Sequence, residues 1–158
     1  MKRLFSISAS RSSRQPWATV WLPWMLWMAL IYALSAQPEV PGPGDKGSLL
    51  RDVFNYGAHA ASYALLTLFS WRVARSAMPW LPRWAARYPG WAAGIWSALF
   101  AVSDEYHQSL VPGRTASLWD LMVDLMGIAT MLVMLAYWEP LRAAARRLLS
   151  RRLGLDRG

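Results

Sequence analysis

Cysteine is absent from the 158 residues of this chain. Its absence excludes a disulfide framework, a thiolate metal site and a cysteine nucleophile. Charge is also scarce, because charged residues make up 16% of the chain, against about a quarter in soluble globular domains. Acidic residues are the scarcest, with 9 Asp and Glu against 17 Lys and Arg. This shortage of charge disfavours an ordinary soluble domain.

The chain is rich in apolar side chains. Hydrophobic residues make up 55% of the chain, which includes 11 tryptophans, and the length suits about one domain. The net charge of +8 would suit nucleic acid if the basic residues formed one patch, but they flank apolar runs instead. We therefore expect membrane lipids as partners and no nucleic acid.

Four apolar stretches are candidates for membrane helices. The first is uncharged and approaches the roughly 20 residues that cross a bilayer core of about 30 Å. The third stays apolar only to Val102, so a spanning helix must carry the polar residues 103–108 in its last turns before Val111-Pro112-Gly113 ends it. The sequence predicts an all-α integral membrane four-helix bundle. The predicted spans are residues 17–35, 53–71, 91–108 and 117–138.

The basic residues predict the orientation of these helices. With four spans, fourteen of the 17 Lys and Arg fall on one side of the membrane, and only Lys46, Arg51 and Arg114 fall on the other. Basic residues mark the cytoplasmic side, so both termini should be cytoplasmic in a bacterial inner (plasma) membrane. The predicted parts are a basic N-terminus (1–16), a membrane domain (17–138) and a basic amphipathic tail (139–158).

Two segments have alternative interpretations. The first span, with its basic flank, also resembles a secretory signal peptide, although it exceeds the usual apolar region of about 7 to 15 residues, which favours a retained helix. The tail from Pro140 onward combines leucines on one face with many arginines. It predicts either an interfacial helix against anionic headgroups or a frayed basic tail that fixes topology.

Polar residues of three predicted helices fall at one depth, in the outer half of the membrane. Ionisable groups in membrane segments are costly and usually face a protein interior or a wet cavity. On the second helix the polar residues share one face through i, i+4 spacing, and the turn after the third helix supplies Arg114. The residues are Asn55, His59 and Tyr63, then Asp104, Glu105 and Gln108, and finally Asp120 and Asp124.

These groups predict a binding pocket with acid–base chemistry. A guanidinium suits a bidentate anion such as phosphate or carboxylate, so we expect Arg114 to hold an anion. Glu105, His59 and Asp104 are the candidate catalytic acid–base groups. No metal-binding spacing is present, so we expect no metal and no cofactor. The other candidate ligand-binding residues are Gln108, Asp120, Tyr63, Asp124 and His107.

Structural roles compete with each of these assignments. Arg114 could neutralise Asp120 or Glu105 as a clamp between helices, and His59 could be a satisfied hydrogen-bond partner. His107, near the end of its helix, could lie at the interface. Asp120 could favour the N-terminus of the fourth helix through the helix dipole. An ion path is disfavoured because no matching polar set occurs in the inner half.

The ordered motif resembles the signature of the VanZ-like family. That signature is Asp-Glu-x-x-Gln, a Pro-Gly-Arg turn, a following Asp, and then a polar residue and Gly in the last helix. Residues 34–38 (LSAQP) are similar to its Ser-x-Gln-Pro exit, and His59 with Tyr63 matches its His-x-x-x-Tyr element. The signature positions here are Asp104, Glu105, Gln108, Pro112-Gly113-Arg114, Asp120, Asp124 and Gly127.

Two positions depart from the family pattern. Tyr56 replaces a basic residue that commonly lies three before the His, and Asp124 replaces the usual Asn. A cation is lost and an anion is gained, which favours a less anionic ligand or a cation. The resemblance covers about residues 20–135.

The resemblance implies a link to the cell envelope. The family's named member is associated with resistance to teicoplanin, a glycopeptide antibiotic that acts on cell-wall precursors outside the membrane. We therefore expect an outward-facing polar pocket that binds, and in an enzyme would modify, an anionic envelope or lipid-linked component. The alternative is a non-enzymatic structural or interaction protein whose polar cluster fixes helix packing. The residues leave open whether the chain is an enzyme.

Overall fold

The chain folds into α-helices. The computed structural model describes residues 17–38, 42–45, 47–77, 82–114 and 117–152, and these ranges contain five helices and no strand. The all-α prediction is therefore confirmed, and a short helix in the second loop adds to it. The helices are α1 (Trp17–Ser35), α2 (Leu49–Ser76), α3 (Arg83–Arg87), α4 (Pro89–Ser109) and α5 (Leu118–Arg152).

Local sequence explains where α2 and α4 begin and end. The Ser48 hydroxyl caps α2 by accepting a hydrogen bond of 3.3 Å from the backbone N–H of Arg51, which satisfies one free donor of the first turn. Pro89 lies in the first turn of α4, where its missing N–H costs nothing. After α4 ends, Gly113 adopts a φ of +86° that glycine tolerates. The polar residues 103–108 therefore form the last turns of α4, as predicted.

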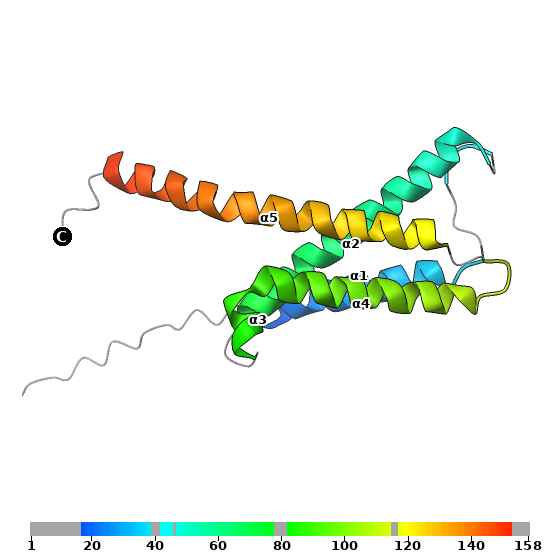
Figure 1. Ribbon diagram of the computed structural model, residues 1–158, viewed down its shortest axis with the longest axis horizontal. Helices are drawn as coiled ribbons and strands as arrows, with labels where there is room; N and C mark the ends of the chain where they lie inside the picture. The colour runs from blue at the N-terminus through cyan, green and yellow to red at the C-terminus, as the bar shows by residue number, and fades with distance from the viewer. Residues whose placement is uncertain (1–16, 39–41, 46, 78–81, 115–116, 153–158) are drawn as a thin grey trace, which may run out of the picture.

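Helix α5 is much longer than a membrane requires. Its 35 residues span about 50 Å at 1.5 Å per residue, and Figure 1 shows its C-terminal half running past the other helices. Pro140 lies inside the helix, so the predicted border between span and tail falls within a continuous helix up to Arg152. The predicted segment 1–16 and the last residues of the tail, 153–158, lie outside the described residues.

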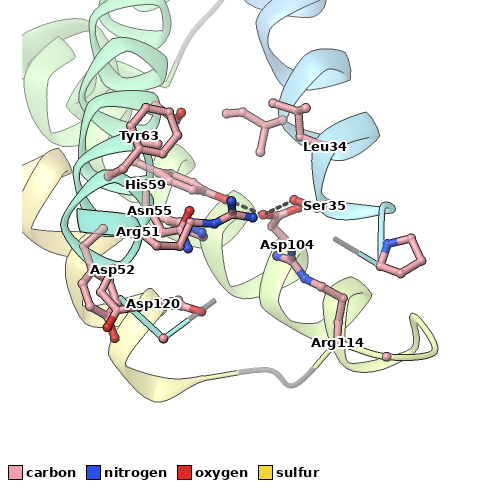
Figure 2. Close-up of a pocket in the computed structure, with 18 residues that line it drawn as sticks. Leu34, Ser35, Arg51, Asp52, Asn55, His59, Tyr63, Asp104, Arg114 and Asp120 are labelled. Carbon is pink, nitrogen blue, oxygen red and sulfur yellow. Dashed lines mark hydrogen bonds between the residues drawn. The ribbon is translucent and has the colours of Figure 1, made fainter. Parts of the chain in front are cut away.

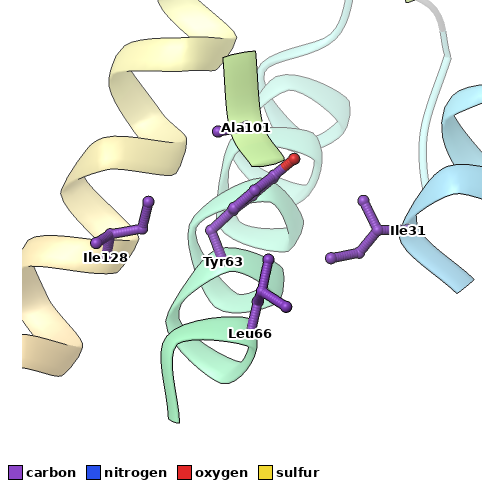
Figure 3. Packing of buried hydrophobic residues seen from close by; sticks show 5 residues of the cluster. All are labelled: Ile31, Tyr63, Leu66, Ala101 and Ile128. Carbon is purple, nitrogen blue, oxygen red and sulfur yellow. The ribbon is translucent and has the colours of Figure 1, made fainter. Parts of the chain in front are cut away.

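Helix α2 is the centre of the packing. It contacts α1, α4 and α5, and its contact with α5 is the most extensive of these. Figure 1 shows α1, α4 and α5 running along the long axis while α2 crosses them obliquely. All four long helices supply a small buried cluster, shown in Figure 3. Its members are Ile31, Tyr63, Leu66, Ala101 and Ile128.

Tryptophan side chains attach α1 to α2. The indole Nε1 of Trp24 donates to Ser70 Oγ at 3.0 Å, and that of Trp27 donates to the backbone oxygen of Ser62 at 2.9 Å. A hydrogen bond between helices satisfies a polar group that lipid could not. These bonds hold α1 beside the middle and the second half of α2.

Two of the helices are long and apolar enough to cross a membrane. They are Ala18–Ser35 and Leu118–Ser150, judged by length and composition. Helices α2 and α4 have 28 and 21 residues, which is also enough length, but their polar residues lower their hydropathy. Two of the four predicted spans therefore coincide with helices that could cross a membrane.

Large apolar side chains point outward on several helices. Leu26 on α1, Leu99 on α4 and Met126 on α5 are 60%, 63% and 66% exposed. Soluble monomers rarely leave contiguous apolar surface uncovered, whereas lipid tails cover such a surface at no cost. The exterior of the helices therefore agrees with the apolar composition in indicating a membrane protein.

Candidate functional site

A cavity of about 550 Å³ lies where four segments of the chain meet. Its walls come from the end of α1, the first half of α2, the last turns of α4 with the following turn, and the start of α5. Figure 2 shows the side chains that line it. The charged and amide groups among them are Arg51, Asp52, Asn55, His59, Asp104, Arg114 and Asp120.

The α2 wall is a stripe of residues four apart. Arg51, Asn55, His59 and Tyr63 line the cavity, and residues spaced i, i+4 share one face of a helix. The stripe predicted from Asn55 to Tyr63 therefore continues one turn upstream to Arg51. The side chain of Arg51 also donates to the backbone oxygen of Gly42 at 2.5 Å, which ties the stripe to the preceding loop.

Asp104 accepts hydrogen bonds from three helices. Its Oδ2 accepts from Ser35 Oγ of α1 at 2.8 Å, from Tyr63 OH of α2 at 3.2 Å and from Gln108 Nε2 of α4 at 3.1 Å. The carboxylate is only 4% exposed, and its Oδ1 has no hydrogen-bond partner. Hydrogen bonds to a buried charge are strong, so Asp104 joins α1, α2 and α4 at the cavity floor.

Gln108 connects this carboxylate to Arg114. Its Nε2 donates to Asp104, while its Oε1 accepts a short hydrogen bond from Arg114 Nη2. The Gln108 side chain is 1% exposed, so the amide holds one orientation. Within the described residues Arg114 makes no ion pair, which means that its charge is positioned by a neutral amide. The alternative role, a clamp with Glu105 or Asp120, is not observed in the part of the chain that the structure describes.

His59 pairs with Asp124 across α2 and α5. Its Nδ1 lies 3.1 Å from Asp124 Oδ1, and Asp124 is completely buried. The helices meet closely here, because a Cβ placed on Gly127 would collide with the backbone carbonyl of Ala60. Glycine at this position lets the two backbones touch and thereby brings Asp124, one turn earlier, to His59.

The other predicted residues lie around this arrangement. Glu105 is buried, its Oε2 accepts from the Ser117 backbone N–H at 3.1 Å, and its Oε1 lacks a partner. It lines a smaller neighbouring pocket with Ser117, whereas Asp120 lines the main cavity. His107 stacks on Tyr32, with ring centroids 4.2 Å apart. The cavity therefore contains His59, Tyr63, Asp104, Arg114 and Asp120, while Glu105, His107, Gln108 and Asp124 lie behind or beside it.

Sequence reasoning missed Arg51 and Ser35 as site residues. The signal for Arg51 was present, because it extends the i, i+4 stripe of Asn55 and His59 by one turn. Ser35 had one signal, as the Ser of the Ser-x-Gln-Pro element, but only the packing of α1 against α4 shows that it reaches Asp104. Tyr56 stands where the family pattern has a basic residue, and Arg51 supplies a cation to the same cavity. Two guanidinium groups, of Arg51 and Arg114, therefore line the cavity.

A comparison with known protein families covers the part of the chain that forms the site. The VanZ/LLP1 family matches residues 11–139, which is most of the chain. The chain belongs to the VanZ/LLP1 family. The predicted resemblance is therefore confirmed, and the match includes all four walls of the cavity. No curated protein and no solved structure matches the chain.

The site of this VanZ/LLP1 protein combines cationic and apolar side chains and can hold an anion. Arg51 and Arg114 offer guanidinium donors suited to phosphate or carboxylate, and the Ile31 and Leu34 side chains line the same cavity. Pockets with a few convergent polar groups and apolar walls are typical ligand sites. Among the described residues, no three His, Asp or Glu side chains lie close enough together to hold a metal ion.

Proposed function

We propose that this chain is a multi-pass protein of the bacterial inner (plasma) membrane, with four spanning helices in a bundle and both termini in the cytoplasm. The lengths of α1, α2, α4 and α5, the apolar exterior and the family membership support this proposal. The cavity then opens on the outer side. Its polar lining in the outer half agrees with the rule that ionisable groups in membranes face a wet cavity.

The cavity binds an anionic cell-envelope or lipid-linked component in this proposal. The single observation that carries it is Arg114, whose side chain lines the cavity and is held there by the neutral amide of Gln108. Asp104, a buried carboxylate that also lines the cavity, accepts its three hydrogen bonds from Ser35, Tyr63 and Gln108 and none from Arg114. The charge of Arg114 is therefore directed at a ligand. The family membership also supports a link to glycopeptide resistance.

Binding of an anionic amphiphile tests this function. The purified protein in detergent is titrated with farnesyl phosphate, and the bound fraction is measured by native mass spectrometry. Arg114→Ala should weaken binding by about 10- to 100-fold, because a hydrogen bond to a charged group contributes roughly 1.5–3 kcal/mol. The control is Arg87→Ala in α3, whose exposed guanidinium lies against Tyr88 away from the cavity. Equal affinity of the Arg114 variant and the wild type would contradict the proposal.

The second candidate is a structural protein whose polar cluster fixes helix packing. The three helices joined at Asp104 favour it. Arg114→Ala and Glu105→Gln separate the two candidates. If both variants keep wild-type thermal stability in detergent but lose teicoplanin tolerance or ligand binding, the cavity is functional. A parallel loss of stability would support the packing role.

A further inference from the structure

The two ring nitrogens of His59 face different surroundings. Nδ1 lies 3.1 Å from Oδ1 of the fully buried Asp124, and the His59 ring lines the cavity. A neutral imidazole that donates from Nδ1 to a carboxylate presents the lone pair of Nε2. Nε2 is thus the ring nitrogen left for a molecule in the cavity.

The buried carboxylate of Asp124 prepares His59 for proton transfer. It fixes the tautomer and stabilises the imidazolium that forms when Nε2 accepts a proton. The close crossing at Gly127 and Ala60 holds the two residues in register. A histidine oriented in this way, at the surface of a cavity that water can enter, has the arrangement of a general base.

The other residues that line the cavity indicate the class of substrate on which His59 would act. Arg51 and Arg114 line the same space as His59 (Figure 2). Guanidinium groups bind phosphate oxygens and stabilise the charge that develops on them during phosphoryl transfer. Ile31 and Leu34 line the α1 side, where an apolar chain can lie beside the anion.

We infer that this chain hydrolyses the phosphate monoester of an anionic lipid, with His59 as the general base and Asp124 as its positioning residue. The inference rests on the proposed function, because the cavity must first bind the anion. The nucleophile in this inference is a water molecule beside Nε2 of His59.

The reaction balances without any further reactant. Nε2 of His59 accepts a proton from a water molecule, and the water oxygen forms a bond to phosphorus. The bond between phosphorus and the lipid alcohol oxygen breaks, and its electron pair stays on that oxygen. The His59 imidazolium then gives its proton to the alkoxide. The products are the lipid alcohol and inorganic phosphate.

Release of phosphate from farnesyl phosphate tests the inference in the full-length protein in detergent. His59→Ala should lower the rate by at least about 100-fold, and added imidazole should restore part of it, because the vacated site opens into the cavity. Asp124→Asn should lower kcat with KM unchanged, as expected for a residue that acts through His59. If His59→Ala does not fold, His59→Gln, which lacks a basic nitrogen, replaces it.

The control is Arg87→Ala in α3. Arg87 lies against Tyr88 outside the cavity lining, so its loss should leave phosphate release unchanged. If the wild type binds farnesyl phosphate through Arg114 but releases no phosphate, the inference fails and the proposed function stands. If the wild type neither binds nor hydrolyses it, both fail. Equal rates for His59→Ala and the wild type, or a phosphoryl group found on His59 itself, would also overturn the inference.

Discussion

Single residues divide the polar cluster into two groups with different roles. Asp104 is buried and receives donors from Ser35, Tyr63 and Gln108, so it holds helices together. Arg114 and His59 line the cavity and have charge or basicity to offer a ligand. Mutations in the first group should therefore affect stability first, and mutations in the second group should affect binding or turnover first.

Asp104→Ala is the residue change that should destabilise the fold most clearly. It leaves three buried donors without their shared acceptor, and each unsatisfied group costs about 1–3 kcal/mol. Because such losses are not additive, we expect the free energy of unfolding to fall by roughly 3 kcal/mol. Unfolding by SDS titration in mixed micelles measures it. Asp45→Ala, at an exposed loop position, should change it by less than about 0.5 kcal/mol, and equal effects would contradict the role of Asp104.

Pairs of helices decide where these residues meet. The close contact of α2 and α5 at Gly127 brings Asp124 to His59, and the contact of α1 with α4 brings Ser35 to Asp104. Neither pair is close in sequence. The site therefore depends on the crossing of the helices as much as on the residues that they carry.

Gly127→Ala tests the helix crossing. The added Cβ would collide with the carbonyl of Ala60, so α2 and α5 must separate, and overpacking of this kind costs about 1–3 kcal/mol. The same substitution at Gly57 in α2 meets nothing within 4 Å and should be neutral or stabilising by up to about 1 kcal/mol, because alanine favours the helix. Thermal unfolding in detergent compares the two. Equal shifts would show that the crossing does not depend on glycine.

The whole molecule has chemically different ends. Figure 1 shows the end of α2, α3, the start of α4 and the end of α5 lying toward one end, with the loops that precede α2 and α5 toward the other. Among the arginines in the described residues, most belong to the elements at the first end, while Arg51 and Arg114 belong to the second. Basic residues stay in the cytoplasm, so this asymmetry should set the direction in which the protein inserts.

Labelling of single cysteines tests the orientation, and the natural chain has none to interfere. Asp45→Cys in the loop before α2 should react with a membrane-impermeant maleimide in intact cells. Ser76→Cys at the end of α2 should react only after the membrane is permeabilised. Both positions are exposed, so a difference in reaction reports sidedness. Labelling of position 76 from outside would reverse the proposed topology.

The helical class, the apolar exterior and the polar stripes could be predicted from the amino-acid sequence. These features follow from composition and from the i, i+4 spacing within one helix, which are local properties. The short helix α3 was not predicted. The continuation of α5 past Pro140 was not predicted either, because a proline usually ends or kinks a helix. The family resemblance could also be recognised from the sequence, because it rests on the order of the motif residues along the chain.

The packing of the helices sets which polar groups share a hydrogen-bond partner. Only the packing showed that Asp104 joins three helices, that Gln108 holds Arg114, and that Asp124 pairs with His59. Helix rotation and crossing set these contacts, and a rotation of one residue position turns a side chain by about 100°. Sequence spacing cannot fix that rotation between helices, because it depends on how closely two backbones approach at points such as Gly127.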